Sequence, residues 1–392
     1  MAKIAILGFG TVGSGIAEVL EMNQGEICRR TGQPAELKYI LVRRDFPDSP
    51  YNDCMVKDFS VIENDPEVRI VAECIGGCKA ALDFTTRALK AGKHVVTSNK
   101  ALVASHGLEL LTLARQHNCN FLFEASVGGG IPVLRPLTFC LSGNQIEEVC
   151  GIINGTTNYI LTKMIRDEKS FDSALLDAQF KGYAESDPSD DVDGIDTCRK
   201  LCILSALAFG RHVYPDQIYT QGIRGITRDD VLGGRAMHRR LKLLGRAVKR
   251  EDGKLTLYVS PHFVAEESPL MGVEDVFNAV QIRGNAVGDV MFYGRGAGKL
   301  PTASAAVGDI VDCLLHDDVR REIDWVEAEP GEIADFSTLP LRWYVRGDQP
   351  CPEAESVFWQ IGAYVTPPMS CARLDALRQS GLKIESAIPL LD

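Results

Sequence analysis

A glycine-rich turn near the amino terminus constrains the fold of this 392-residue chain more than any other feature. The turn Gly8-Phe-Gly10-Thr-Val-Gly13 follows the apolar segment Lys3–Gly8 and precedes a helical pattern over Ser14–Met22. In such a turn the first glycine permits a sharp reversal and the second lets a pyrophosphate approach the backbone. The third lets the helix pack on the strand, and the phosphate lies at the helix N-terminus. The sequence therefore predicts a dinucleotide-binding strand–turn–helix unit.

Strand and helix patterns alternate up to about residue 130, which predicts a Rossmann-type, doubly wound parallel sheet. The expected strands are Leu37–Val42, Ile70–Ile75, His94–Thr97 and Asn120–Phe123, and the expected helices are Ala80–Ala91 and Gly107–Asn118. A hinge at Gly128–Pro132 separates residues 1–130 from an expected α+β domain over 131–329, and 330–392 is expected to form a small third unit. The segment 302–315 is predicted to be a helix that packs back on the first domain, with Pro301 and Thr302 as start signals.

The formal net charge of −11 argues against nucleic acid or an acidic membrane surface as a partner. No apolar run is long enough to span a bilayer, and the first residues lack a signal-peptide pattern. Twelve scattered cysteines are either disulfide-forming or buried reduced thiols, and their position in apolar segments favours thiols. We therefore expect a cytoplasmic protein.

The end of the second expected strand bears on cofactor preference. An acidic residue that would bind the ribose hydroxyls of NAD is missing, and Val42 is followed by Arg43 and Arg44. An arginine here suits a 2′-phosphate, so NADP(H) is favoured while NAD(H) stays possible. The alternative is that both arginines are solvated charges at a strand end.

A crowded acidic stretch lies between Lys181 and Lys200. It holds six carboxylates: Glu185, Asp187, Asp190, Asp191, Asp193 and Asp196. A solvated loop followed by a helix start explains the part over Ser189–Asp193. It does not explain Asp196 and Lys200, which lie one turn apart in an otherwise apolar helix. A lysine among buried acids suits proton transfer, and a carboxylate cluster suits a substrate ammonium.

Three further motifs allow two interpretations each. Thr97-Ser-Asn-Lys100 closes a strand at its carboxyl end, where open α/β sheets bind ligands, so Lys100 is expected near the nicotinamide rather than as an ordinary surface lysine. Glu124 beside the glycines of residues 128–130 offers hard oxygen ligands for a cation, but the residues alone favour a simple hinge. Asn154–Asn158 either caps a helix over Tyr159–Ile165 or binds a substrate carboxylate.

Together these segments resemble the homoserine dehydrogenase family over about residues 3–320. The most specific segments are Val96–Ala104, Glu124–Pro132, Gly151–Met164, Gly182–Lys200 and Gly294–Ala305. The resemblance implies NAD(P)H-dependent interconversion of L-aspartate 4-semialdehyde and L-homoserine, a step toward threonine and methionine. It also implies a homodimer formed through the sheet of the second, catalytic and dimerisation domain. A dehydrogenase for another amino-acid semialdehyde and a catalytically silent amino-acid sensor are the rival interpretations.

The resemblance also assigns roles to residues. Lys200 becomes the proton donor, Lys100 orients the substrate, and Glu185, Asp196 and Asp191 bind homoserine. The cofactor positions are Phe9, Gly10, Thr11, Val12, Arg43, Thr97, Lys100, Gly182 and Gly298. The family's sodium site corresponds to Glu124 and to the main-chain carbonyls of Val127, Gly129 and Ile131, which reverses the preference for a simple hinge.

The carboxyl-terminal region departs from the family pattern. Many bacterial relatives carry an ACT domain, a ligand-sensing βαββαβ unit, at this end. Here Leu341–Pro350 resembles its first strand and Leu382–Leu391 a later one, but Gln-Pro-Cys-Pro replaces the usual glycine. We therefore expect a small, diverged ACT-like remnant over 330–392, and feedback inhibition by threonine is in doubt.

Overall fold

The structure is a computed structural model and describes residues 2–317 and 319–391. It divides into two compact units, each built from several stretches of chain. The first comprises the chain up to Gly143 together with Cys202–Tyr214 and Gly294–Glu327, and the second comprises Asn144–Leu201, Pro215–Tyr293 and the chain from Ala328. Helix α9 (Ile195–Phe209) runs from the second unit into the first. The predicted division at 130 and 330 stays a prediction.

The first unit contains a six-stranded parallel sheet in the order β3-β2-β1-β4-β5-β6. Its strands are β1 (Lys3–Leu7), β2 (Glu36–Leu41), β3 (Met55–Val56), β4 (Val68–Glu73), β5 (His94–Thr97) and β6 (Phe121–Leu122). Residues 4–7 of β1 are completely buried, as expected for a central strand covered on both faces. The predicted Rossmann-type sheet is confirmed.

Helices of the first unit are α1 (Thr11–Met22), α2 (Gln24–Thr31), α3 (Phe59–Glu63), α4 (Lys79–Lys90), α5 (Lys100–Gln116) and α11 (Lys299–Leu315). Helix α11 packs against α1, where a Cβ on Gly15 would lie 2.8 Å from the carbonyl oxygen of Lys299. Four predicted helix starts were wrong by three or more residues. Helix α1 begins at Thr11 instead of Ser14, and α11 begins at Lys299 instead of residue 302. Helix α5 begins at Lys100 instead of Gly107, and α6 (Gly155–Arg166) begins at Gly155 instead of Tyr159, because Asn99 and Asn154 cap these helices directly.

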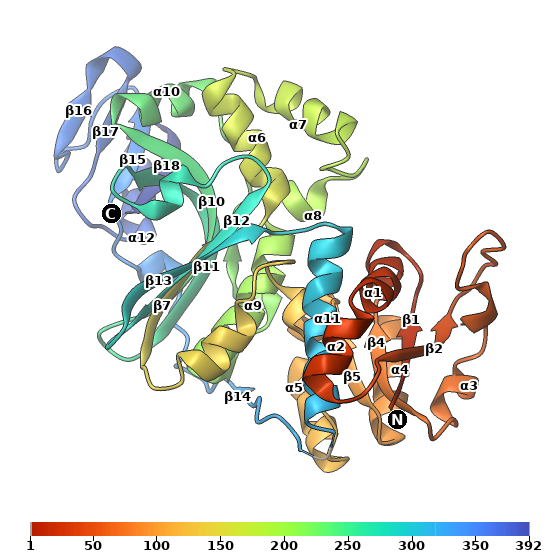
Figure 1. Ribbon diagram of the computed structural model, residues 1–392. Helices are drawn as coiled ribbons and strands as arrows, with labels where there is room; N and C mark the ends of the chain where they lie inside the picture. The colour runs from red at the N-terminus through yellow and green to blue at the C-terminus, as the bar shows by residue number, and fades with distance from the viewer. Residues whose placement is uncertain (1, 318, 392) are drawn as a thin grey trace. The chain divides into compact units, whose positions relative to one another are not determined.

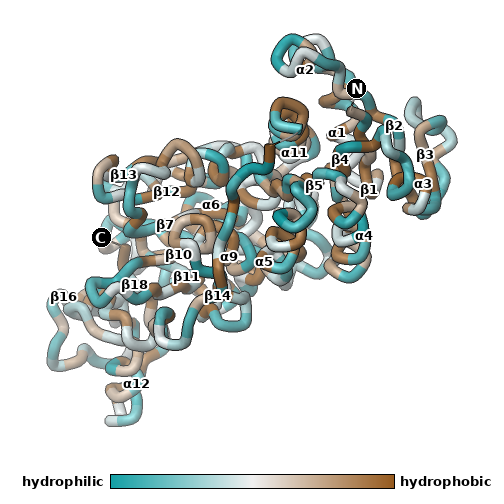
Figure 2. The backbone as a smooth tube through the Cα atoms, turned by 90° about the horizontal axis from the view of Figure 1, so that it is seen from below, coloured by the Kyte–Doolittle hydropathy of each residue, from teal (hydrophilic) through white to brown (hydrophobic). Residues whose placement is uncertain are grey.

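The second unit is built on a ten-stranded mixed sheet in the order β13-β12-β7-β10-β11-β18-β15-β17-β16, with β9 paired to β11 (Figure 1). Its first strands are β7 (Ile146–Ile152), β9 (Tyr219–Thr220), β10 (Arg239–Lys249), β11 (Leu255–Ala265), β12 (Phe277–Gly284) and β13 (Gly288–Arg295). Hydrophobic residues, brown in Figure 2, recur along these strands, and every residue of β11 is buried. The hairpin turn between β10 and β11 contains Asp252-Gly253, and Gly253 has a φ of 83°.

The remaining strands, β15 (Trp343–Gly347), β16 (Ser356–Phe358), β17 (Ala363–Val365) and β18 (Ile384–Leu391), form the carboxyl-terminal end of the sheet. Their order, β18-β15-β17-β16, and their antiparallel pairing are those of a split βαββαβ unit. Helix α12 (Cys371–Gln379) connects β17 to β18, but no helix lies in the described segment between β15 and β16. The expected remnant thus keeps the strand order and lacks the first helix.

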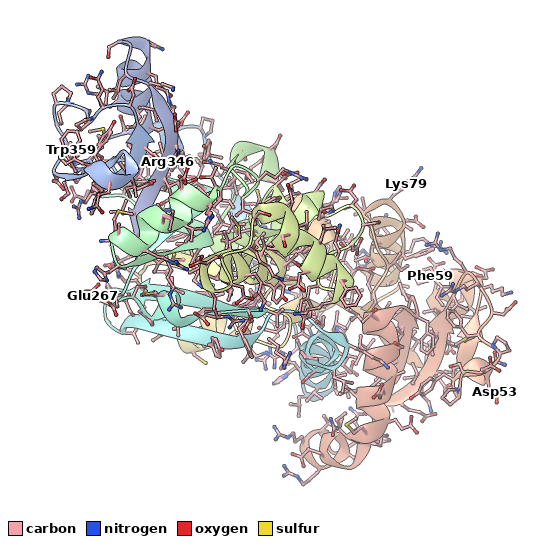
Figure 3. All side chains as sticks on the ribbon, turned by 90° about the horizontal axis from the view of Figure 1, so that it is seen from above. Asp53, Phe59, Lys79, Glu267, Arg346 and Trp359 are labelled. Atoms are coloured by element: carbon pink, nitrogen blue, oxygen red, sulfur yellow. The ribbon has the colours of Figure 1, made fainter. Side chains whose placement is uncertain are left out.

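The other helices of the second unit are α6 (Gly155–Arg166), α7 (Phe171–Phe180), α8 (Ser189–Val192) and α10 (Arg228–Ala236). Arg346 of β15 ties the carboxyl-terminal strands to α10 (Figure 3). Its Nε lies 3.4 Å from the Asp230 carboxylate, which is fully buried and forms a capping box with Thr227. Across the described residues, the helices are all too short or too polar to serve as a membrane span.

Candidate active site

A cavity of about 570 Å³ opens at the carboxyl ends of β1, β2 and β4 in the first unit. This edge of an open parallel sheet is where α/β proteins bind ligands. The lining comprises the glycine turn, the end of β2 and the segments that follow β3 and β4: Gly8, Phe9, Gly10, Leu41, Val42, Arg43, Arg44, Phe46, Lys57, Cys74, Ile75, Gly76, Ala80 and Phe84. The predicted positions Phe9, Gly10 and Arg43 therefore share one cavity.

The glycine turn needs its glycines for steric reasons. Gly8 has a φ of 95°, a conformation that side chains disfavour. A Cβ on Gly13 would lie 2.0 Å from the Gly8 carbonyl oxygen, so a larger residue would push α1 away from the turn. Thr11 and Val12 form the first turn of α1, where main-chain N–H groups have no partner within the helix. The geometry suits a pyrophosphate at the start of α1.

One end of this cavity is basic and aromatic. The Arg44 guanidinium lies 5.0 Å from the centre of the Phe46 ring, and Phe46 meets Phe9 edge-on at 5.3 Å. Lys57, between β3 and α3, joins Arg43 in the lining and pairs with Asp45 at 2.7 Å. The sequence analysis missed Lys57, because its place beside Arg43 depends on β3 pairing with β2.

The ends of β4 and β5 are joined by a buried carboxyl group. Glu73 is completely buried and accepts hydrogen bonds from the Thr97 hydroxyl and the Ile75 amide, both at 2.6 Å. Burial raises the pKa of Glu73 to about 7. Asn99 donates to the carbonyls of Ile75 and Gly77 and caps α5, whose first residue is Lys100. Glu73 and Asn99 therefore fix the positions of Thr97 and Lys100.

The second unit gathers a lysine, two acids and an amide. The Lys200 ammonium donates to Asp196 at 2.7 Å and to the Ile153 carbonyl at 2.8 Å. The Asn154 amide donates to Asp191 at 2.7 Å and to Asp196 at 2.9 Å, and its oxygen caps α6. Burial, followed by the nearby charge of Asp196, raises the pKa of Asp191. The structure thus brings Lys200, Asp196 and Asp191 together, with Asn154 as a member whose link to both acids the sequence analysis did not predict.

Glu185 and Gly182 lie in the loop between α7 and α8. This loop is held near the start of α6, where the Thr156 hydroxyl donates to the Tyr183 carbonyl at 2.7 Å. Gly182 has a φ of 73°, which favours glycine at this position. The Glu185 side chain is exposed, and no contact among the described residues joins its carboxylate to Lys200 or Asp196.

Glu124 organises the turn over residues 124–131, the candidate cation site. Its carboxylate accepts three main-chain N–H groups, from Val133, Leu134 and Arg135, at 2.7–2.9 Å. A Cβ on Gly129 would lie 2.4 Å from the Gly296 carbonyl oxygen, so the loop is closely packed. In the described part of the chain, no group of three or more His, Cys, Asp or Glu side chains could hold a metal ion. One Glu124 oxygen accepts two of the N–H groups and the other accepts only one, so the second oxygen keeps acceptor capacity for a hard cation.

Comparison with known proteins identifies the family. A family model for the NAD binding domain of homoserine dehydrogenase matches residues 8–124, and one for homoserine dehydrogenase matches residues 132–311. The chain is 39% identical to the homoserine dehydrogenase of Pseudomonas aeruginosa over 98% of this chain and 87% of that protein. A crystal structure of a homoserine dehydrogenase from Thiobacillus denitrificans superposes with a TM-score of 0.92 at 33% identity, covering 100% of this chain and 98% of that one. The chain belongs to the homoserine dehydrogenase family.

The activity follows from family membership. As a homoserine dehydrogenase, the enzyme interconverts L-aspartate 4-semialdehyde and L-homoserine with a nicotinamide cofactor, a step of threonine and methionine biosynthesis. The first family model covers the glycine turn and strands β2 to β6 of the parallel sheet, and the second covers the Lys200 cluster. Each of the two sites described above thus lies in the region that the corresponding model matches.

The buried carboxyl of Glu73 predicts a pH dependence of stability. Its folded pKa of about 7 lies above the value of about 4 expected for an unfolded glutamate. The folded state then binds the proton more tightly, so this group makes the free energy of unfolding fall as pH rises from about 4 to 7. As the pH rises from 4 to 8, we expect the free energy of unfolding of Glu73→Gln to increase by roughly 2–4 kcal/mol relative to that of the wild type. Urea unfolding of both proteins across this pH range measures the difference in free energy of unfolding. A difference that does not change with pH would contradict the prediction.

Proposed function

We propose that Lys200 is the general acid of this homoserine dehydrogenase and that the acids around it bind the substrate ammonium. The observation that carries the proposal is the Lys200 ammonium, held at 2.7 Å by Asp196 and at 2.8 Å by the Ile153 carbonyl. A lysine has three N–H donors, so a third remains for the carbonyl oxygen of the aldehyde. The charge of the ammonium opposes the negative charge that develops on that oxygen.

In the direction of homoserine formation, bound NAD(P)H supplies the hydride to the aldehyde carbon. The aldehyde oxygen becomes an alkoxide, and Lys200 transfers a proton to it from Nζ. Asp196 stays ionised and keeps Lys200 oriented, as its position one helical turn away allows. Asp191 and Glu185 supply negative charge for the substrate ammonium. We assign Lys100, the first residue of α5, the role of orienting the substrate, which rests on its place after β5 and on the family resemblance.

We also propose that NADP(H) is preferred over NAD(H). The support is the basic end of the cofactor cavity, where Arg43, Arg44 and Lys57 line the wall. A 2′-phosphate carries negative charge that such a wall would balance, and no acidic residue takes the ribose position. A hyperthermophilic archaeal homoserine dehydrogenase with a TM-score of 0.68 and 29% identity, covering 80% of this chain and 98% of that one, was solved in complex with NADPH. Thr11, Val12, Thr97, Gly182 and Gly298 complete the proposed cofactor contacts.

A sodium ion at the Glu124 turn is the third proposal. The ligands would be one Glu124 oxygen and the main-chain carbonyls of Val127, Gly129 and Ile131. The ion would reinforce a turn that already depends on the Glu124 carboxylate for three main-chain N–H groups. It takes no part in hydride or proton transfer in this proposal.

Three further proposals concern the assembly, the cellular location and the regulation of the enzyme. A homodimer through the second unit's sheet is supported by the exposed edge strand β13, whose outer N–H and C=O groups favour association. A cytoplasmic location is supported by the cysteine pattern and charge of the sequence. Kinship of the split βαββαβ end with ACT domains rests on its strand order, and its missing first helix argues against threonine binding.

Replacing Lys200 tests the mechanism. Lys200→Met should lower kcat for homoserine oxidation by about 10²–10⁴-fold, the usual contribution of a positioned acid or base. The dissociation constant of NADPH, measured by fluorescence, should change by less than about twofold, roughly 0.4 kcal/mol. Lys249→Met, at an exposed position of β10, is the matched control and should keep its kcat. Equal losses of NADPH binding and kcat would make Lys200 a structural residue.

Arg43 and Lys57 determine cofactor choice if the second proposal holds. Arg43→Ala and Lys57→Ala should each raise KM for NADP by about tenfold, since each removes one charged contact to phosphate of roughly 1.5 kcal/mol. KM for NAD should change little, because NAD has no 2′-phosphate. Steady-state kinetics with NADP and with NAD shows whether the residues contact the 2′-phosphate or serve the cavity as a whole. A parallel rise of both KM values would show that the residues serve the cavity and not the phosphate.

Sodium binding can be measured without activity. Replacing tetramethylammonium chloride by sodium chloride at constant ionic strength should raise the thermal midpoint of the wild-type protein, because an ion bound to the folded state stabilises it. Glu124→Gln should lose this response, whereas Glu147→Gln, on the exposed face of β7, should keep it. A sodium response equal in wild type and Glu124→Gln would place the ion elsewhere.

A further inference from the structure

A second large cavity lies in the second unit, remote from the Lys200 cluster. Its volume is about 540 Å³, within the range of small-molecule sites, and residues of α6, α10 and β10 contribute to its lining. The lining combines apolar and cationic side chains with one carboxylate: Thr162, Ile165, Arg166, Val231, Gly234, Arg235, His238, Arg239, Arg240, Leu241, Lys242, Phe263, Met271 and Glu274. Four arginines and one lysine thus line one cavity of a protein whose net charge is −11.

Lys242 is the unusual member of this lining. Only 1% of the residue is exposed, and its ammonium donates to the Asn158 side-chain oxygen at 3.1 Å and to the Val273 carbonyl. Among the described residues, no carboxylate lies within salt-bridge distance of it. Burial lowers the pKa of Lys242 to about 8, which still leaves the ammonium mostly protonated at neutral pH. A buried ammonium without a counterion is costly, and its third N–H remains for an acceptor.

The surrounding arginines already have partners. Arg240 pairs with Glu274, Arg235 pairs with Glu168 at 2.7 Å, and Arg239 donates to the Leu391 carbonyl. These contacts hold the guanidinium groups at the rim while their charge continues to act on the cavity. An incoming anion therefore meets a preformed positive field and one ammonium that needs a counter-charge.

We propose that this cavity binds a small organic anion, a carboxylate or phosphate group on an apolar body, with the anionic oxygens on Lys242. The apolar body would pack against the lining side chains of Ile165, Phe263 and Met271. The cavity meets α6 at Thr162–Arg166, whereas the Lys200 cluster meets it at Asn154. These points are eight to twelve residues apart along the helix, or about 12–18 Å. The anion would therefore bind together with the substrate and not in competition with it.

The test uses the full-length enzyme saturated with NADPH and L-homoserine. This pair contains no hydride acceptor, and it occupies the cofactor and substrate sites, where anions would otherwise bind. Benzoate and inorganic phosphate are titrated separately by calorimetry, at ionic strength held constant with chloride. We expect saturable binding of at least one probe. Tighter binding of benzoate would identify an organic carboxylate as the ligand, and tighter binding of phosphate would identify a phosphate group.

Two variants and a control connect the binding to this cavity. Lys242→Met should weaken binding at least about tenfold. Met271→Glu adds a carboxylate to the lining at a half-buried position and should have the same effect, even if Lys242→Met folds poorly. Arg378→Gln removes an exposed charge on α12 and should leave the affinity unchanged. The proposal is overturned if neither probe binds to wild type, or if binding is as tight in Met271→Glu as in wild type.

Discussion

The buried ion pair of Lys200 and Asp196 is the interaction on which the junction of β7, α6 and α9 in the second unit depends. Moving an ammonium and a carboxylate out of water costs several kcal/mol per ion, and pairing offsets this only when the remaining donors and acceptors are also bonded. Here the Ile153 carbonyl and the Asn154 amide provide those bonds. Removal of any one of these groups would leave a buried charge incompletely compensated, so the pair, the end of β7 and the start of α6 are fixed together.

The sheet beneath this pair determines where the lysine lies. Gly245 of β10 pairs with Gly151 of β7, two residues before Ile153. A Cβ on Gly245 would lie 3.1 Å from the Thr197 methyl group and 3.6 Å from the Leu201 Cβ. Gly245 therefore lets α9 lie close to the sheet, in the arrangement in which Lys200 lies within hydrogen-bond distance of the Ile153 carbonyl. The register of β7 against β10 and the lack of a side chain on Gly245 thus determine where Lys200 lies.

The sequence predicted local features well and the relations between distant segments poorly. The strand His94–Thr97 was predicted with the bounds of β5, and the glycine turn was correctly placed directly after β1, although its residues Thr11–Gly13 already belong to α1. The hairpin of β10 and β11 was missed, although Asp252-Gly253 is a hairpin signal, because β11 is buried along its whole length and lacks the alternation typical of a half-buried strand. Lys57 and Asn154 could not be assigned from spacing, because Lys57 joins Arg43 in the cavity lining only through the pairing of β3 with β2, and Asn154 meets Asp191 and Asp196 only in the folded unit.

The carboxyl-terminal strands are part of the sheet of the second unit. Strand β18 pairs with β15 on one side and, in parallel, with β11 on the other, so the four strands extend the sheet of the second unit. Tyr258 of β11 packs in the same hydrophobic cluster as Phe336, Trp343 and Leu374, and this cluster is incomplete without it. A separable sensor domain needs its own closed core and a small, polar interface with the enzyme. The carboxyl-terminal end has neither a closed core nor a small interface, because it shares its hydrophobic cluster and its sheet with β11. In addition, Arg346 forms a charged contact with Asp230 of α10. Residues 330–391 therefore continue the sheet of the second unit and share its hydrophobic core.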